Sequence, residues 1–216
     1  MRKRFVFRSL SRAAHPVLLT VLAALAGLAG NAQQGLLRLN LDYAVALPAG
    51  AFRDVVSHGS FRGFDASLMY GLNDRVSIGF NTGFQDFYQK YPRQVYTTSD
   101  GSDISAVVTN SVQVVPLMAK VQYRLGSSRV WQPYAGLAAG GYSVLYRQYL
   151  GEFAGSNNRF RFGFRPELGI YIPFSGQGES GLTISGVYNY LPFHSAGISS
   201  MNSFGIRLGA SFPIRE

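Results

Sequence analysis

Cysteine is absent from the 216-residue sequence, and charged residues make up only 14% of it. Without cysteine the chain has no disulfide, no thiolate metal ligand, no cysteine nucleophile and no lipid anchor on an N-terminal cysteine. The charge content lies below the roughly one quarter that is usual for soluble domains. Hydrophobic residues make up 47%, which excludes an intrinsically disordered chain because there is ample apolar surface to bury.

The sequence also lacks a long apolar run beyond its N-terminus, so no membrane-spanning helix is expected there. At the N-terminus, basic residues precede the apolar stretch 17–29, and small residues follow at Gly30 and Ala32. This pattern is typical of a secretory signal peptide. The alternative is an uncleaved anchor, but a spanning helix needs ~20 apolar residues. The sequence therefore predicts a cleaved signal peptide over residues 1–32 and a single domain over residues 33–216.

The positive charge of the chain is modest once the signal peptide is removed. The formal net charge of +9 falls to +4, because residues 1–32 hold five arginine and lysine residues and no acidic residue. An excess of this size is not typical of nucleic-acid binders, and export also separates the protein from nucleic acid. No nucleic-acid partner is expected.

The stretch RFRFGFRPELGIYIP at positions 159–173 alternates polar and apolar residues with a period of two. From Phe160 to Ile172 every second residue is apolar, and the residues between them are charged, small or hydroxylated. Successive side chains of a strand point to opposite faces, so one face of this strand is wholly apolar. A strand of this length, tilted as in a membrane barrel, covers roughly 33 Å along the membrane normal and suits a bilayer.

The same alternation recurs along the chain. Eight segments are expected as strands, at positions 37–47, 64–72, 76–85, 117–125, 131–149, 160–172, 182–190 and 204–212. In the fifth and least regular one, the lipid-facing side is assigned to Tyr134, Tyr142, Val144 and Tyr146. Pro116 lies at the start of the fourth predicted strand and Pro166 inside the sixth, and at both we expect bulges or shifted strand ends. The predicted fold is all-β, an eight-stranded antiparallel up-and-down transmembrane β-barrel.

The connections between these segments alternate in length. Short turns are expected at 72–75, 126–129 and 175–180, and longer polar loops at 48–60, 91–106, 150–158 and 191–200. In bacterial outer-membrane barrels the short turns face the periplasm and the long loops face outward. Both chain ends are therefore expected in the periplasm.

A soluble β-sandwich is the alternative fold, because its strands also alternate. The polar faces here carry charges in mid-strand, which a sandwich core would bury only at a high cost in free energy. Aromatic residues also gather near strand ends, as they do at the two membrane interfaces of a barrel. These residues are Phe64, Tyr70, Phe84, Tyr123, Tyr134, Tyr146, Phe160, Tyr188 and Phe212.

Five stretches carry a resemblance to a known family: LRLNLDYAVALPAGAF, VVPLMAKVQYRL, WQPYAGLAAGGY, FRPELGIYIP and FGIRLGASF. With them the chain resembles the small outer-membrane β-barrel family, which includes the transmembrane part of OmpA, OmpX and OmpW. The resemblance implies a place in the bacterial outer membrane, contact with lipid and lipopolysaccharide, and insertion by the barrel-assembly machinery. Phe212 would be the aromatic signal for that machinery, although Pro213 to Glu216 follow it.

The interior of an eight-stranded barrel is just wide enough for side chains to fill. The inward faces carry charges of both signs, and buried charges need partners. We therefore predict a lumen cluster of ion pairs, formed by Asp42, Asp65, Lys120, Arg165, Glu167 and Arg207. Arg38, Arg124 and Arg161 also face inward. The cluster is predicted to plug and stiffen the barrel; the alternative is a gate through which a small solute passes.

Catalytic patterns are weak in this sequence. The predicted domain holds two histidines, His58 and His194, both in expected outer loops. His194-Ser195 resembles the His-x-Ser-Asn signature of lipid A deacylases, but the spacing differs and the asparagine is absent. Ser57-His58 with Asp54 nearby gives no better nucleophile and base pair. The protein is therefore predicted not to be an enzyme.

Metal and cofactor patterns are also weak. Asp100, Asp103 and Glu152 lie in expected loops without the spacing of a calcium-binding loop. The glycine-rich stretch AGLAAGGY lacks the Gly-Lys-Ser/Thr ending of a phosphate-binding loop. No cofactor and no bound metal are expected.

The sequence supports one functional prediction and two alternatives. The prediction is a non-enzymatic integral outer-membrane barrel with a structural or surface-interaction role and a side-chain-filled lumen. A surface ligand would bind the outer loops, of which 91–106 mixes tyrosines with hydroxyl and acidic residues. The alternatives are an OmpW-like conduit for small or hydrophobic solutes, opening at the small residues of the fifth strand, and an accessory barrel for protein export.

Overall fold

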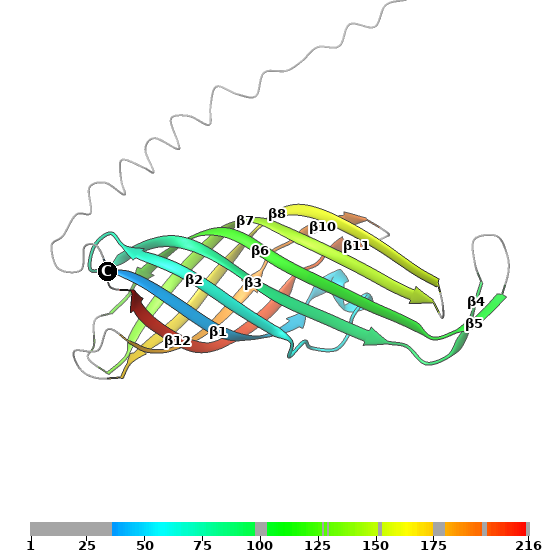
Figure 1. The fold of residues 1–216 in the computed structure, drawn as a ribbon, viewed down its shortest axis with the longest axis horizontal. Helices are drawn as coiled ribbons and strands as arrows, with labels where there is room; N and C mark the ends of the chain where they lie inside the picture. The colour runs from blue at the N-terminus through cyan, green and yellow to red at the C-terminus, as the bar shows by residue number, and fades with distance from the viewer. Residues whose placement is uncertain are drawn as a thin grey trace, which may run out of the picture.

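Eight long antiparallel strands close into one barrel in the computed structural model, as Figure 1 shows. Each barrel strand pairs with the next, and β1 pairs with β12 to close the wall. The barrel strands are β1 (Leu37–Pro48), β2 (Gly63–Gly71), β3 (Val76–Lys90), β6 (Val108–Arg124), β7 (Gln132–Leu150), β8 (Phe153–Pro173), β9 (Gly181–Asn189) and β12 (Ser203–Ile214). The predicted fold class is confirmed.

The structure describes residues 36–97, 103–126, 128, 130–150, 153–174, 180–195 and 198–214. The predicted signal peptide, residues 1–32, lies outside them. Within the described ranges, no helix combines the length and the apolar character that crossing a membrane requires.

In the described residues, one short helix and two hairpins connect the barrel strands at the end opposite to the start of β1 and the end of β12. The 3-10 helix η1 (Gly50–Asp54) follows β1. The hairpin strands are β4 (Gln94–Thr97) with β5 (Asp103–Ala106), and β10 (Pro192–Ser195) with β11 (Ile198–Ser200). The β4–β5 hairpin projects beyond the wall in Figure 1. Long connections therefore gather at one end of the barrel, as the sequence predicts.

The loop predicted at 150–158 is wrong. β7 and β8 stay paired as far as Leu150 and Phe153, and both strands reach well past the outer ends of β9 and β12 (Figure 1). A strand that extends beyond the lipid needs no apolar face. Polar residues such as Ser156 and Asn157 therefore look like a loop in the sequence although they lie in a strand.

The alternation along the strands sorts side chains between lipid and lumen. Large apolar side chains stay exposed on the outside of the isolated barrel, where lipid would cover them. Examples from seven strands are Leu41, Leu68, Phe80, Leu117, Leu168, Ile184 and Leu208. Charged side chains such as Asp65, Lys120 and Arg165 are buried inside. A soluble sandwich has the opposite arrangement, with apolar side chains inside and charged ones outside. The sandwich alternative is therefore wrong.

The lipid-facing side predicted for the fifth strand, β7, is also wrong. Tyr134, Tyr142 and Val144 are buried, with 5%, 2% and 0% of their surface exposed, while Leu137 is exposed on the outer face. Tyr146 packs against the same interior cluster. Tyr134 and Tyr146 therefore do not belong to the aromatic girdles in which the sequence placed them.

The tyrosines of β7 turn inward because both their rings and their hydroxyl groups find partners there. The rings of Tyr134 and Tyr142 lie over Gly169 and Gly163 of β8, where any larger side chain would collide with the ring. The Tyr134 hydroxyl donates a hydrogen bond to Glu167 at 2.9 Å. A tyrosine with a polar partner suits the lumen as well as the membrane interface, so residue type alone does not fix the side.

Pro116 in β6 and Pro166 in β8 each interrupt one ladder without shifting it. Pro116 stays opposite Tyr142 of β7, and Pro166 stays opposite Leu137 of the same strand. The gaps lie on the other side, towards β3 and β9, and the register is the same on both sides of each gap. The expected bulges are wrong, because each proline points its backbone nitrogen, which carries no hydrogen, at one neighbouring strand only. The other expectation, a shifted strand end, is confirmed for β6, which begins at Val108 instead of position 117.

The predicted weak wall at the fifth strand is wrong as well. β7 pairs without interruption with β6 over Tyr134–Leu150 and with β8 over Gln132–Leu150. The shortest ladders are those between β8 and β9, over Glu167–Pro173, and between β1 and β2, over Leu37–Tyr43, each followed by one isolated bridge. Small residues in β7 make room for side chains in the lumen. They do not interrupt the ladders that β7 forms with β6 and β8.

Candidate functional site

A cluster of buried ion pairs crosses the middle of the lumen. Lys120 Nζ lies 2.8 Å from Glu167 Oε2, and Arg165 Nη1 lies 3.2 Å from Asp65 Oδ2. Arg207 Nη1 bridges the two carboxylates, at 3.2 Å from Asp65 Oδ1 and 3.3 Å from Glu167 Oε2. All five side chains are at most 4% exposed. The cluster joins strands β2, β6, β8 and β12 across the barrel.

Asp42, the sixth residue of the predicted cluster, lies beside these pairs. Its Oδ1 accepts a hydrogen bond from Thr183 Oγ1 at 2.6 Å, and it lies within electrostatic range of Arg207. Within the described residues, Asp42 forms no ion pair at 4 Å or less. With Asp42 included, three acidic side chains balance three basic ones, which favours keeping all six charges in a site of low dielectric.

Two polar residues that the sequence did not assign complete the cluster. Asn81 of β3 donates to Asp65 Oδ1 at 2.5 Å and accepts a hydrogen bond from Arg165. Tyr134 donates to Glu167. Hydrogen bonds of this kind satisfy the carboxylate oxygens that ion pairs leave open. The inward position of Asn81 in its strand was the signal of its role in the sequence, and it lies opposite Ser67, one inward position along β2 from Asp65.

The outer half of the lumen is filled by apolar side chains. Phe52 of η1, Phe193 of β10 and Leu191 just before it fold over the lumen and are almost fully buried. The cluster comprises Ala46, Phe52, Val56, Phe87, Val112, Val114, Met118, Ala138, Tyr142, Val144, Leu191, Phe193 and Met201. Between this cluster and the ion pairs lies a cavity of about 50 Å³, lined among others by Ala44, Val114 and Arg165. This apolar cap was not predicted.

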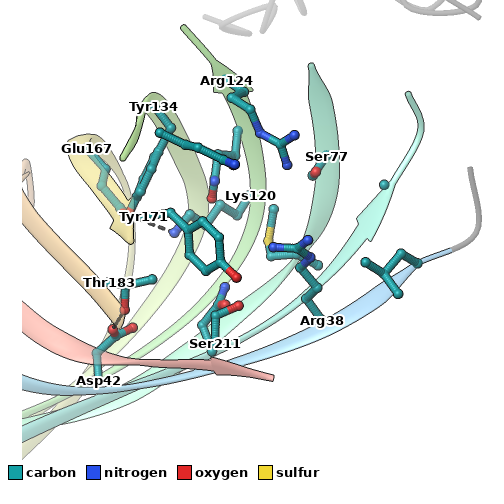
Figure 2. Close-up of a pocket in the computed structure, with 16 residues that line it drawn as sticks. Arg38, Asp42, Ser77, Lys120, Arg124, Tyr134, Glu167, Tyr171, Thr183 and Ser211 are labelled. Atoms are coloured by element: carbon teal, nitrogen blue, oxygen red, sulfur yellow. Dashed lines mark hydrogen bonds and ion pairs between the residues drawn. The ribbon is translucent and has the colours of Figure 1, made fainter. Parts of the chain in front are cut away.

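The other half of the lumen, which is expected to face the periplasm, is polar instead. This half holds a cavity of about 40 Å³. Its lining, drawn in Figure 2, includes Arg38, Lys120, Arg124 and Tyr171. The Arg38 guanidinium lies 5.2 Å from the centre of the Tyr171 ring. Lys120 and its partner Glu167 form the inner boundary of this cavity. The ion pairs therefore separate a polar inner half of the lumen from an apolar outer half.

Of the candidate catalytic residues, the described pair Ser57 and His58 lacks the partner of a catalytic histidine. His58 Nδ1 lies 2.6 Å from Gln89 Oε1 and 3.4 Å from Ser57 Oγ, on an exposed part of the outer surface. An amide partner does not supply the carboxylate that orients a catalytic histidine. The side chains of His194 and Ser195 lie outside the described part of the structure.

The described residues also contain no group of three or more histidine, aspartate or glutamate side chains that would hold a metal ion. Asp100, Glu152 and the side chain of Asp103 lie outside them. Among the described side chains, the lumen cluster is the densest group of ionisable residues, and every carboxylate in it is already engaged.

A closed barrel with lipid-facing apolar residues and a charged interior defines an integral membrane β-barrel. The chain belongs to the outer membrane protein β-barrel domain family, which it matches over residues 17–212. It is a protein of the bacterial outer membrane.

Two solved structures share the fold. Neisserial surface protein A has a TM-score of 0.55 and 14% sequence identity, over 82% of this chain and 97% of that one. The outer membrane protein OprG from Pseudomonas aeruginosa has a TM-score of 0.52 and 12% identity, over 85% of this chain and 98% of that one. No curated protein matches the sequence significantly. At these identities the likeness extends to the fold alone.

Replacing Asp65 with alanine is expected to lower the free energy of unfolding by about 3–5 kcal/mol, because Arg165 and Arg207 would stay buried without that carboxylate. The matched control is Asp86→Ala. Asp86 pairs at 3.7 Å with Arg62, which is 69% exposed, so the expected loss is about 0–1 kcal/mol. Denaturant unfolding of both variants in lipid vesicles measures the difference. Equal losses would contradict a structural role for the cluster.

Proposed function

We propose that this protein is a non-enzymatic outer-membrane barrel whose lumen is closed and whose outer surface makes the functional contacts. The observation that carries the proposal is that two barriers lie one after the other across the lumen. The ion pairs of Asp65 and Glu167 fill its middle, and the apolar cap under η1 and the β10–β11 hairpin fills its outer half. Neither barrier leaves room for a hydrated solute.

The proposal includes export and insertion of the chain. Residues 1–32 are removed as a signal peptide, and the barrel-assembly machinery inserts the remainder next to lipid and lipopolysaccharide. Phe212 supports this step, because it faces outward near the end of the closing strand β12 with 43% of its surface exposed. An aromatic residue at the end of the last strand is the feature that the family resemblance assigns to this recognition.

The outer ends of β3, β6, β7 and β8 are the proposed contact surface. They continue as one paired sheet beyond the rim of β9 and β12 (Figure 1). Outward-facing side chains on this part are polar or amphipathic, among them Tyr88, Ser111 and Arg147. A rigid sheet standing above the membrane presents such residues to a surface ligand at a low cost in conformational entropy.

Planar-bilayer recordings test the closed lumen. Wild-type protein and the double variant Arg165→Gln/Arg207→Gln are both expected to be silent, because the apolar cap blocks the outer half even when the central charges change. Arg159→Gln, on the exposed outer part of β8, is the matched control. A steady conductance of the wild-type protein that the double substitution changes would contradict the proposal. It would show that ions pass through the lumen.

Uptake of a small hydrophobic solute is the second candidate function. The outer cavity is lined by Phe84 and Pro116 of the wall as well as by Val114 and Leu191 of the interior. The β3–β6 ladder is interrupted beside Pro116. Arg165 lines the same cavity, and its Nε has no hydrogen-bond partner among the described residues. These features favour a small apolar molecule that carries one acceptor atom.

Filling this cavity tests the second candidate. Ala44→Leu places a larger side chain in the cavity and is expected to abolish saturable binding of acetone, a small molecule with a single acceptor oxygen, to the refolded protein. Ala66→Leu adds the same volume on the opposite, lipid-facing side of the wall and is expected to leave binding unchanged. Saturation-transfer NMR of the acetone methyl signal during titration reports the binding. Failure of the wild-type protein to bind acetone saturably would contradict uptake by this route.

A further inference from the structure

Two arginines meet at the periplasmic mouth of the lumen. Arg38 comes from the second position of β1, and Arg124 is the last residue of β6. Both side chains are half-buried and reach into the polar cavity drawn in Figure 2. Arg124 lies within electrostatic range of Arg38 and of Asp74, an exposed residue of the β2–β3 turn. Two like charges at a cavity mouth repel each other and favour an anion between them.

The carboxylates inside the cavity are already engaged. Glu167 pairs with Lys120 and Arg207, and Asp42 accepts the hydroxyl of Thr183. Within the described residues, Arg38 forms no ion pair at 4 Å or less; its guanidinium lies over the ring of Tyr171. The ring holds the side chain in place while leaving the edge donors of the guanidinium available.

The neutral part of the cavity wall is rich in hydrogen-bonding groups. Gln122 continues the inward row of β6 above Arg124, and Gln132 begins β7. Hydroxyl groups come from Ser77 of β3 and Ser211 of β12. Amide and hydroxyl donors of this kind complete the coordination of an oxyanion held by charged side chains.

We propose that the periplasmic half of the lumen binds a small oxyanion of phosphate size between Arg38 and Arg124. Guanidinium groups match phosphate oxygens in a two-pronged geometry. The cavity of about 40 Å³ holds roughly three water molecules on the usual scale, which is close to one phosphate ion. The Lys120–Glu167 pair closes its inner end, so the ligand enters and leaves only through the periplasmic mouth.

Titration of the refolded protein with inorganic phosphate tests the proposal. The protein is held in neutral detergent micelles, and sodium chloride keeps the ionic strength constant, so that general charge screening does not change. Arginine side-chain and backbone NMR signals are followed by residue. We expect saturable shifts at Arg38, Arg124 and Tyr171, and none at Arg159 on the outer part of β8. Shifts that grow without saturation, or that appear equally at Arg159, would overturn the proposal.

Two variants locate the site. Arg38→Gln is expected to weaken phosphate binding about tenfold or more, because it removes a charge-assisted hydrogen-bond donor. Arg75→Gln removes the same charge from an exposed position of the neighbouring turn outside the cavity, and binding should match the wild type. An equal loss of phosphate affinity in both variants would show that phosphate is attracted by net charge alone, and it would contradict the proposal. If Arg38→Gln does not fold, the residue-resolved titration of the wild type still decides.

Discussion

The ion pairs that Asp65 and Glu167 make with Lys120, Arg165 and Arg207 are the constraint on which the barrel interior depends. Taking five charges out of water is costly, and only mutual pairing with further hydrogen bonds offsets that cost. The pairs come from four strands on different sides of the wall, so they hold the barrel to one diameter and one register. Asn81 and Tyr134 matter because they complete the hydrogen bonding of the same carboxylates.

The cluster also divides the lumen into halves with different chemistry. Towards the outer surface, inward side chains such as Val114 and Val144 pack with Phe52 and Leu191 as in a soluble core. Towards the periplasm, Arg38 and Arg124 line a polar cavity. We therefore propose that the protein acts through contacts at its surfaces rather than by passage of solutes through the lumen. Its accessible surfaces are the outer sheet on one side of the membrane and the basic mouth on the other.

Most of the fold was predictable because a period-two pattern fixes which face of a strand meets lipid. The lumen residues Asp65, Lys120, Arg165, Glu167 and Arg207 were predictable for the same reason. The period-two pattern gave wrong predictions where a strand no longer needs one apolar face towards lipid and one polar face towards the lumen. In β7 the tyrosines bond inside the lumen, and past the membrane β8 needs no apolar face. The apolar cap was missed because Phe52, Leu191 and Phe193, which close it, come from the connections, whose folding over the lumen no local pattern encodes.

Side-specific labelling of a single cysteine tests the closed lumen most directly. The chain has no cysteine of its own, so Ser77→Cys places one thiol in the periplasmic cavity. A water-soluble, membrane-impermeant thiol reagent is added to one side of an oriented membrane at a time. We predict modification from the periplasmic side and none from the outer side, because the ion pairs and the apolar cap lie between. Comparable rates of modification from both sides would contradict the account.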